Sequence, residues 1–275
     1  MSLYINMRIC LIAKDYSASD AEGAYIVSLA SGLAGLGHDV TVLCSSCDKK
    51  SDGRVKVEQV TQAKRVQELK LLNKKLPDSA RFCAEQIGYW HTFEALSEVR
   101  PFEVVEAVES VSGALLAAFT RSTPTVVRLG KEPIKAGEEF DSSFPKLAYD
   151  FAFSSTDLFS CASQDERAAF LEKTMLPEDC IVVNAITDEL ALNALKAYVR
   201  AGERFSTVPK PHLYRHGARQ LIRSTEDMLA LFDRMLYDLL FRVSYRFRMK
   251  HWLSKLANDP AAFKKRLLRV LHPEV

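Results

Sequence analysis

Three groups of residues in this sequence could bind a ligand, and the first lies where a loop meets a helix. Glu22 and Gly23 end a segment over 14–23, just before a helical pattern continues. Free backbone N–H groups at the start of a helix suit a phosphate or carboxylate, and Gly23 would allow a close approach to the backbone. The Glu22 carboxylate would repel a diphosphate, and an ordinary turn that needs one glycine explains the same residues.

Carboxylates and cations follow two later apolar runs. Glu106 and Glu109 stand at the end of one run, where they could accept hydrogen bonds from the hydroxyl groups of a ligand. Arg128, Gly130 and Lys131 leave the other run, and the two cations could bind an anionic group. Structural roles fit equally well, because the acids could cap a helix or face water, and the cations could be solvated or paired.

The sequence offers no recognisable catalytic group and no metal-binding motif. Cys44 and Cys47 have the spacing of a redox pair, but a zinc site would need two further ligands and no second paired motif occurs. The six histidines are scattered, and His38 is interpreted as structural because it follows the turn glycine Gly37. A G-x-G-x-x-G fingerprint is absent, which argues against NAD. We therefore expect neither a metal nor a cofactor.

Apolar runs alternating with helical patterns predict the elements that position these residues. The segments Arg8–Ala13 and Gly37–Leu43 flank an amphipathic helix, as in the first strand–helix–strand unit of a doubly wound sheet. Further strands are predicted at 55–60, 104–107 and 124–129, and helices at 62–76, 79–99, 110–121 and 189–201. We therefore predict the α/β class, with a Rossmann-like doubly wound, mostly parallel sheet. Such sheets bind ligands at the carboxyl ends of their strands.

The C-terminal part of the chain differs in charge and pattern. Residues 1–195 contain 20 lysines and arginines against 28 aspartates and glutamates, whereas residues 196–275 contain 17 against 7. Beyond Asp188 the pattern predicts helices, including a long one from about 226 to 256. We therefore divide the chain into a Rossmann-like domain, 1–188, and a basic α-helical extension, 189–275. Basic and aromatic side chains mix on the long helix: Arg242, Arg246, Phe247, Arg248, Lys250 and Trp252.

This mixture of basic and aromatic side chains has three interpretations. The helix could pack on its own domain or a partner chain, lie on an anionic membrane surface, or bind nucleic acid, which is the least favoured. No apolar run is long enough to span a membrane, and no signal peptide is recognised. Irregularly spaced cysteines indicate free thiols in a reducing compartment. We expect a cytoplasmic protein, with peripheral membrane association as an open alternative.

Several segments together resemble family 4 glycosyltransferases, which have the two-domain GT-B fold. The segments MRICLIAKDY and EGAYIVSLASGLAGLGHDVTVL are similar to the start of that family, and the turn Gly35-Leu-Gly-His38 is characteristic of it. The matching later segments are 104–107, 123–129, 156–163 and 179–188. The resemblance covers residues 7–188 and implies the N-terminal, acceptor-side domain of an enzyme that uses a nucleotide-sugar donor.

The sequence departs from the family pattern in both halves. Glu22-Gly23 replaces a pair of glycines, and Gly130 lies near the place of a histidine that often contacts the transferred sugar. The family's second domain holds the donor partly through two acids eight positions apart, and 196–275 contains no such pair. The resemblance thus implies an acceptor-side half whose donor is bound by a partner chain, and a homo-oligomer is the alternative partner. A noncatalytic GT-B-derived binding or scaffold protein and a compact single-chain glycosyltransferase are the alternatives.

Overall fold

The structure is a computed structural model that describes residues 6–47, 53–60, 77–108, 123–130, 156–173 and 177–207. The chain divides into two compact units, Met1–Thr225 and Glu226–Val275, and all described residues belong to the first. The predicted helices at 62–76, at 110–121 and from about 226 to 256 lie outside the described residues. In the described part of the chain, no helix has the length and apolar character needed to cross a membrane.

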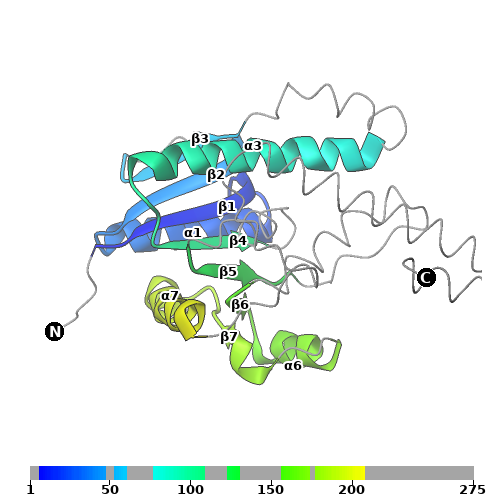
Figure 1. The fold of residues 1–275 in the computed structure, drawn as a ribbon. Helices are drawn as coiled ribbons and strands as arrows, with labels where there is room; N and C mark the ends of the chain where they lie inside the picture. The colour runs from blue at the N-terminus through cyan, green and yellow to red at the C-terminus, as the bar shows by residue number, and fades with distance from the viewer. Residues whose placement is uncertain are drawn as a thin grey trace, which may run out of the picture. The chain divides into compact units, whose positions relative to one another are not determined.

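The described strands form one parallel sheet of seven strands in the order β3-β2-β1-β4-β5-β6-β7 (Figure 1). They are β1 (Arg8–Tyr16), β2 (Asp39–Cys47), β3 (Val55–Gln59), β4 (Val104–Val108), β5 (Thr125–Arg128), β6 (Leu158–Cys161) and β7 (Ile181–Val183). All residues of β4, β5 and β6 are buried, as expected for parallel strands covered on both faces. The predicted fold class is confirmed, and the described sheet is parallel throughout.

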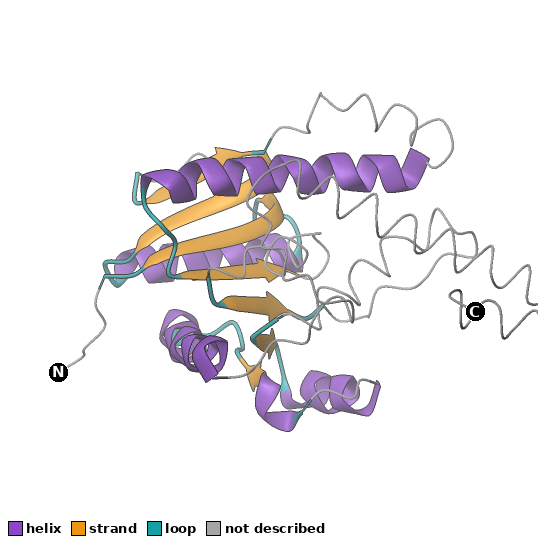
Figure 2. Cartoon of the chain, viewed as in Figure 1, coloured by secondary structure: helices purple, strands orange, loops and turns teal. Residues whose placement is uncertain are grey.

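Helices cover both faces of this sheet (Figures 1 and 2). Helix α3 (Pro77–Val99) lies on one face, and α1 (Ala21–Gly35) and α7 (Leu190–Thr207) lie on the other. Helix α6 (Gln164–Lys173) contacts β6 and β7, and a short 3-10 helix, η1 (Glu178–Cys180), precedes β7. The buried positions of α7 recur every three or four residues, which is the spacing that places them on one helical face.

Helices α1 and α7 share one hydrophobic core with alternate residues of the strands. A Cβ added at Gly32 of α1 would lie 2.9 Å from the Cβ of Ala191 on α7, so a small residue allows the two helices to approach closely. The core includes Ile9 and Leu11 of β1 and Ala194 of α7. The helix after Asp188 therefore packs on the sheet that precedes it, while the predicted domain boundary at this residue stays a prediction.

Two predicted element boundaries were wrong. Strand β1 continues to Tyr16 because β2 runs beside it as far as Cys47, which extends the ladder past Lys14. The predicted loop over 14–23 is therefore confined to 17–20. Helix α7 continues to Thr207, beyond the predicted end at 201, and Arg204 in its last turn donates to the carbonyl oxygen of Asp157 at 2.9 Å.

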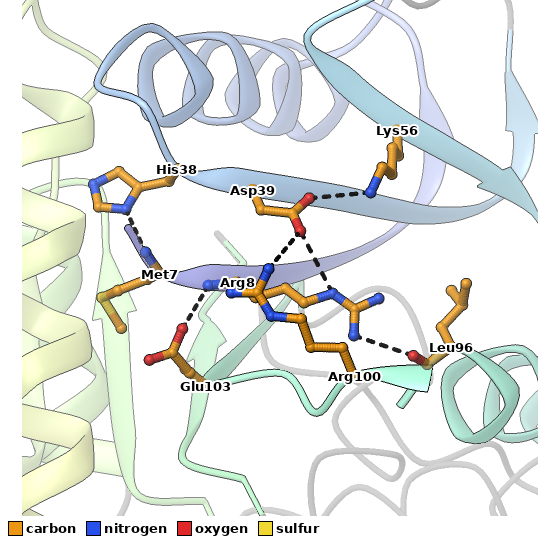
Figure 3. Close-up of polar contacts among 8 residues, drawn as sticks. All are labelled: Met7, Arg8, His38, Asp39, Lys56, Leu96, Arg100 and Glu103. Atoms are coloured by element: carbon orange, nitrogen blue, oxygen red, sulfur yellow. Dashed lines mark hydrogen bonds and ion pairs between the residues drawn. The ribbon is translucent and has the colours of Figure 1, made fainter. Parts of the chain in front are cut away.

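Polar contacts at the amino ends of the strands tie β1, β2 and α3 together (Figure 3). The Asp39 carboxylate lies 3.3 Å from Lys56 Nζ, 3.7 Å from Arg8 Nε and 3.6 Å from Arg100 Nη1. The Arg8 guanidinium donates to the carbonyl oxygen of Leu96 at 3.1 Å, so one buried cation links two strands and a helix. These contacts lie at the end of the sheet opposite to the carboxyl ends of the strands.

Candidate functional site

The strand order locates the candidate site at the carboxyl ends of β1 and β4. The chain builds outward from β1 through β2 to β3, and then returns to place β4 on the other side of β1. The order of the strands therefore reverses between β1 and β4, and open parallel sheets bind ligands at the carboxyl ends of the strands at such a reversal. The segment after β1 and the N-terminus of α1 lie at this edge.

The loop from Ser17 to Asp20 is organised by its own hydrogen bonds. Asp20 caps α1, because its Oδ1 accepts a 2.7 Å bond from the backbone N–H of Gly23. The hydroxyls of Ser17 and Ser19 lie 2.6 Å apart. Glu22 is half-buried in the first turn, where a carboxylate interacts favourably with the helix dipole. Capping by a carboxylate already occupies one of the N–H groups that the sequence offered to an anion.

Gly23 lies inside α1, and its backbone is approached by the chain itself. A Cβ at this position would overlap the carbonyl oxygen of Ser17 and lie 3.3 Å from Asp20 Oδ1. The close approach that requires glycine here is therefore made by the loop. A role for Glu22 and Gly23 in ligand binding stays a prediction.

Glu106 lies in the middle of β4 and is fully buried, although the sequence suggested the end of a strand. Its Oε1 accepts a 2.5 Å hydrogen bond from the hydroxyl of Tyr25 on α1, and its Oε2 accepts one of 2.5 Å from Tyr198 on α7. The Ser160 hydroxyl of β6 lies 3.5 Å from Oε1. Burial raises the pKa of Glu106, and the hydrogen bonds from the two tyrosines oppose that rise. This carboxyl group joins two helices to the sheet.

Arg128 belongs to the same buried network as Glu106. Its guanidinium stacks over the Tyr25 ring, 4.1 Å from the ring centroid, and donates a 2.6 Å hydrogen bond to the carbonyl oxygen of Asn184. Arg128 is 6% exposed, and its guanidinium is already engaged by these contacts within the fold. The structure thus brings Glu106 and Arg128 together beneath the edge of the sheet.

The remaining predicted site residues are divided between the described and undescribed parts of the chain. Gly130 is half-buried just after β5. Glu109 and Lys131 lie outside the described residues, as do the six basic and aromatic residues predicted to form a membrane or partner surface between 242 and 252. Their predicted roles stay predictions.

A second polar cluster at the carboxyl ends of the strands was not predicted. On the α3 face, the Tyr89 hydroxyl donates a 2.9 Å hydrogen bond to the carbonyl oxygen of Ala13 and lies 2.9 Å from Ser45 Oγ. Gln59 Nε2 donates to the Ser45 carbonyl oxygen at 3.0 Å, and Ser46 bonds to Asp15. These residues place polar groups from three strands and one helix at the same edge.

The sequence did contain a signal for some of these residues. Glu106 is flanked by Val105 and Ala107 within an apolar run, and a buried acid requires nearby donors. The tyrosine donors themselves could not be identified, because they come from helices 81 and 92 positions away. Gln86 stands three residues before Tyr89 and seven before Phe93, on the buried face of α3, where an apolar residue would be expected.

Metal binding and thiol chemistry depend on the grouping of side chains and on the burial of Cys44 among the described residues. Among them, no group of three histidine, cysteine, aspartate or glutamate side chains could hold a metal ion. Cys44 of the Cys44–Cys47 pair is buried, and burial raises the pKa of its thiol to about 12, so it carries little thiolate at neutral pH.

Three solved glycosyltransferase structures are similar to part of this chain. WaaG, a glycosyltransferase involved in lipopolysaccharide biosynthesis, aligns with a TM-score of 0.44 and 12% identity, over 64% of this chain and 44% of WaaG. A glycosyltransferase from Rickettsia africae ESF-5 aligns with a TM-score of 0.43 and 12% identity, over 66% of this chain and 43% of its own. CalG4, the calicheamicin glycosyltransferase, aligns with a TM-score of 0.42 and 14% identity, over 66% of this chain and 53% of CalG4. The chain thus spans roughly half of these proteins or less.

Comparison with protein families gives a direct assignment. No curated protein matches this chain. Residues 22–185, more than half of the sequence, match the family described as the glycosyl transferase 4-like domain. This match confirms the resemblance predicted from the strand and turn motifs, and the chain belongs to the glycosyl transferase 4-like domain family.

Proposed function

We propose that this chain is the acceptor-binding half of a sugar transfer system, in which a partner chain binds the nucleotide-sugar donor. The observation that carries the proposal is the parallel sheet whose strand order reverses between β1 and β4, in a chain of the glycosyl transferase 4-like family. In glycosyl transfer, an acceptor hydroxyl forms a bond to the anomeric carbon of the donor sugar as the bond to the nucleotide diphosphate breaks. Much of the rate comes from positioning the two reactants, so two chains can share the task.

The division of labour between two chains rests on the sequence beyond the matched region. Residues 196–275 lack the spaced acidic pair that grips the donor in the resembling family. Helix α7 extends into this region from Leu190 and packs on α1, so it forms part of the core of the described sheet. A donor site supplied from outside fits both observations.

The proposal is tested by separating donor binding from transfer. We expect calorimetric titration of the purified chain with UDP- and GDP-sugars to give no heat of binding at millimolar donor. The chain immobilised as bait should then recover a partner that binds one of these donors, and the two chains together should transfer labelled sugar to a lipid or saccharide acceptor. Tight donor binding by the chain alone would support the compact single-chain enzyme instead.

A noncatalytic role is a second candidate, favoured by the internal contacts of the predicted site residues. Glu106 and Arg128 are buried in hydrogen bonds and ring contacts, and Gly23 accommodates the chain's own loop. This arrangement suits a scaffold that keeps the fold without its chemistry. Failure of the recovered complex to transfer sugar from any nucleotide-sugar donor would favour the scaffold.

Membrane association through the basic extension is a separate proposal. The excess of lysine and arginine over 196–275 would attract anionic lipid, and the interleaved aromatic side chains would enter the interface. Flotation of the chain with phosphatidylserine vesicles should be lost on charge reversal at Arg242, Arg246 and Arg248. Flotation that persists in this variant contradicts the proposal.

A further inference from the structure

Four side chains in the described structure have a buried polar atom that no hydrogen bond satisfies, and among these four Gln86 alone has two such atoms. Gln86 of α3 is 2% exposed, and within the described structure neither its Nε2 nor its Oε1 has a hydrogen-bond partner. Buried side-chain amides are nearly always paired, because an unpaired one loses its bonds to water without replacement. An amide that is left with both a donor and an acceptor is suited to a ligand that offers the complementary pair.

The position of Gln86 in the fold is at the ligand-binding edge of the sheet. Helix α3 begins beyond the carboxyl ends of the strands and runs back along the sheet toward their amino ends (Figure 1). Gln86 precedes Tyr89 by three residues, so the two lie on one face of α3, with Gln86 nearer the strand ends. Tyr89 is fixed there by its contacts with Ala13 and Ser45, at the ends of β1 and β2.

The groups around Gln86 define the chemistry of the ligand. Glu85 is half-buried beside it and interacts with Lys14 of β1 and Ser45 of β2. One cation and one carboxyl group offset each other, and the other polar groups are the hydroxyls of Ser45 and Tyr89. A phosphate would meet a carboxyl group here without an excess of positive charge. An uncharged molecule with several hydroxyls matches the amide and the two hydroxyls.

We propose that Gln86, together with Ser45 and Tyr89, binds the hydroxyl groups of an uncharged sugar unit of the acceptor. This assignment rests on the proposed function, and it moves the acceptor contacts to the α3 face of the sheet, away from Glu106 and Arg128. Gln86 acts here by accepting from one sugar hydroxyl and donating to another. It is a specificity residue and takes no part in bond making.

The test uses the full chain and the methyl glycosides of glucose, galactose and mannose as probes. Binding is followed by nuclear magnetic resonance of the Gln86 side-chain amide, whose signal is the one missing from the Gln86→Leu spectrum. We expect one of the glycosides to shift this signal at millimolar concentration. Loss of two hydrogen bonds should then weaken binding about tenfold or more in Gln86→Leu.

Stability provides the second measurement and Thr41→Val the matched control. Thr41 of β2 is also fully buried, and within the described structure its hydroxyl has no hydrogen-bond partner. Its backbone lies opposite Cys10 of β1, nearer the amino ends of the strands and away from the proposed site. Both variants remove an unsatisfied polar group, so both should keep or raise Tm. Only Gln86→Leu should weaken glycoside binding. Gln86→Met, which keeps the unbranched shape, replaces the leucine variant if that variant folds poorly.

The outcomes separate this inference from the proposed function. Equal glycoside affinity in wild type and Gln86→Leu would overturn the role of Gln86 and leave the acceptor function standing, with the sugar bound elsewhere. A clear loss of Tm in Gln86→Leu and Gln86→Met would also overturn it, because the amide would then be paired within the fold. If no glycoside shifts the Gln86 signal, the inference fails, and the two-chain transfer assay alone decides the proposed function.

Discussion

The hydroxyl of Tyr198 on α7 donates a 2.5 Å hydrogen bond to Oε2 of Glu106 on β4, 92 positions earlier in the chain. Tyr25 of α1 donates to the other oxygen of the same carboxyl group at 2.5 Å. The two helices on one face of the sheet are therefore joined through a single buried acid. Burial raises the pKa of both tyrosine hydroxyls, and the nearby Glu106 carboxylate raises each further.

Removing one tyrosine hydroxyl should destabilise the fold measurably. We expect Tyr198→Phe to lower the free energy of unfolding by about 1–3 kcal/mol, because a buried carboxyl oxygen loses its donor. Urea unfolding followed by circular dichroism measures the change. Val199→Ala, which alters a 48% exposed residue of the same helix, is the control and should change stability little. Equal stability of Tyr198→Phe and wild type would show that the bond contributes nothing.

The two tyrosines should also be energetically coupled. Tyr25 and Tyr198 share one acceptor group, so the destabilisation of the double variant should differ from the sum of the single variants by more than about 0.5 kcal/mol. A double-mutant cycle over Tyr25→Phe and Tyr198→Phe measures this coupling directly. Strict additivity would mean that each hydroxyl acts on Glu106 independently.

Glu106 should give the protein an unusual pH dependence of stability. Burial raises its folded-state pKa above the ordinary value of 4.5, so the folded state holds this proton after the unfolded state has released it. Its stabilising contribution is therefore complete below the ordinary pKa and declines as the pH rises toward the folded pKa. Glu106→Gln cannot titrate and should lack this decline.

The comparison of wild type with Glu106→Gln isolates that contribution from other carboxyl groups. Urea unfolding at a series of pH values gives the difference in stability between the two proteins. We expect wild type to lose stability relative to Glu106→Gln as the pH rises above about 4.5. A difference that stays constant, or that changes in the opposite direction, would contradict a raised pKa.

Local sequence pattern was sufficient for strands β1 to β5 and insufficient for the candidate site. The apolar runs at Arg8–Ala13 and Val104–Ala107 identified strands because burial on both faces leaves a continuous apolar signature. The end of β1 was misplaced because Lys14 is polar and exposed, while its backbone still pairs with β2. Pairing with a neighbouring strand is a tertiary property that one segment's composition does not record.

For the site residues too, the sequence indicates the residue type, while tertiary packing decides its surroundings. The sequence predicts that Arg128 could bind an anionic group, and this stays a prediction, whereas its position over the Tyr25 ring depends on where α1 packs on the sheet. The position of Gln86 on the apolar face of a helical pattern is a weak signal, because a single amide there is compatible with pairing inside the fold. Its unpaired state becomes visible only when its burial and its neighbours are known together.

Gly23 provides a test of the loop that follows β1. Alanine normally stabilises a helix relative to glycine, yet a Cβ at Gly23 would overlap the Ser17 carbonyl oxygen. We expect Gly23→Ala to lower the free energy of unfolding by about 1–3 kcal/mol, the range typical of overpacking. Gly35→Ala in the same helix is the matched control, because nothing lies within 4 Å of a Cβ there. It should leave stability unchanged or raise it by about 0.4–1 kcal/mol.

The measurement for both glycine variants is chemical unfolding, supported by far-ultraviolet circular dichroism. The contrast between the two positions is what the loop geometry predicts. If Gly23→Ala were as stable as Gly35→Ala, the loop would have room to move away from α1. A loop that can move away from α1 would also leave space for a ligand at the start of that helix.

His38 should titrate below the ordinary histidine range. Its Nδ1 accepts a 3.1 Å hydrogen bond from the backbone N–H of Met7, which requires a neutral ring (Figure 3). Burial lowers the pKa of His38 from its ordinary value of 6.5, although Glu103 opposes the shift. As the pH falls below 6.5, the unfolded state binds a proton before the folded state does, so stability declines on the acidic side.

Nuclear magnetic resonance titration, with the His38 signal identified by its absence in His38→Gln, should give a midpoint below 6.5. His38→Gln should also lose that part of the acid dependence, because its amide does not titrate. A midpoint at or above the ordinary value would mean that the ring charges in the folded protein and that the bond from Met7 does not hold the histidine neutral.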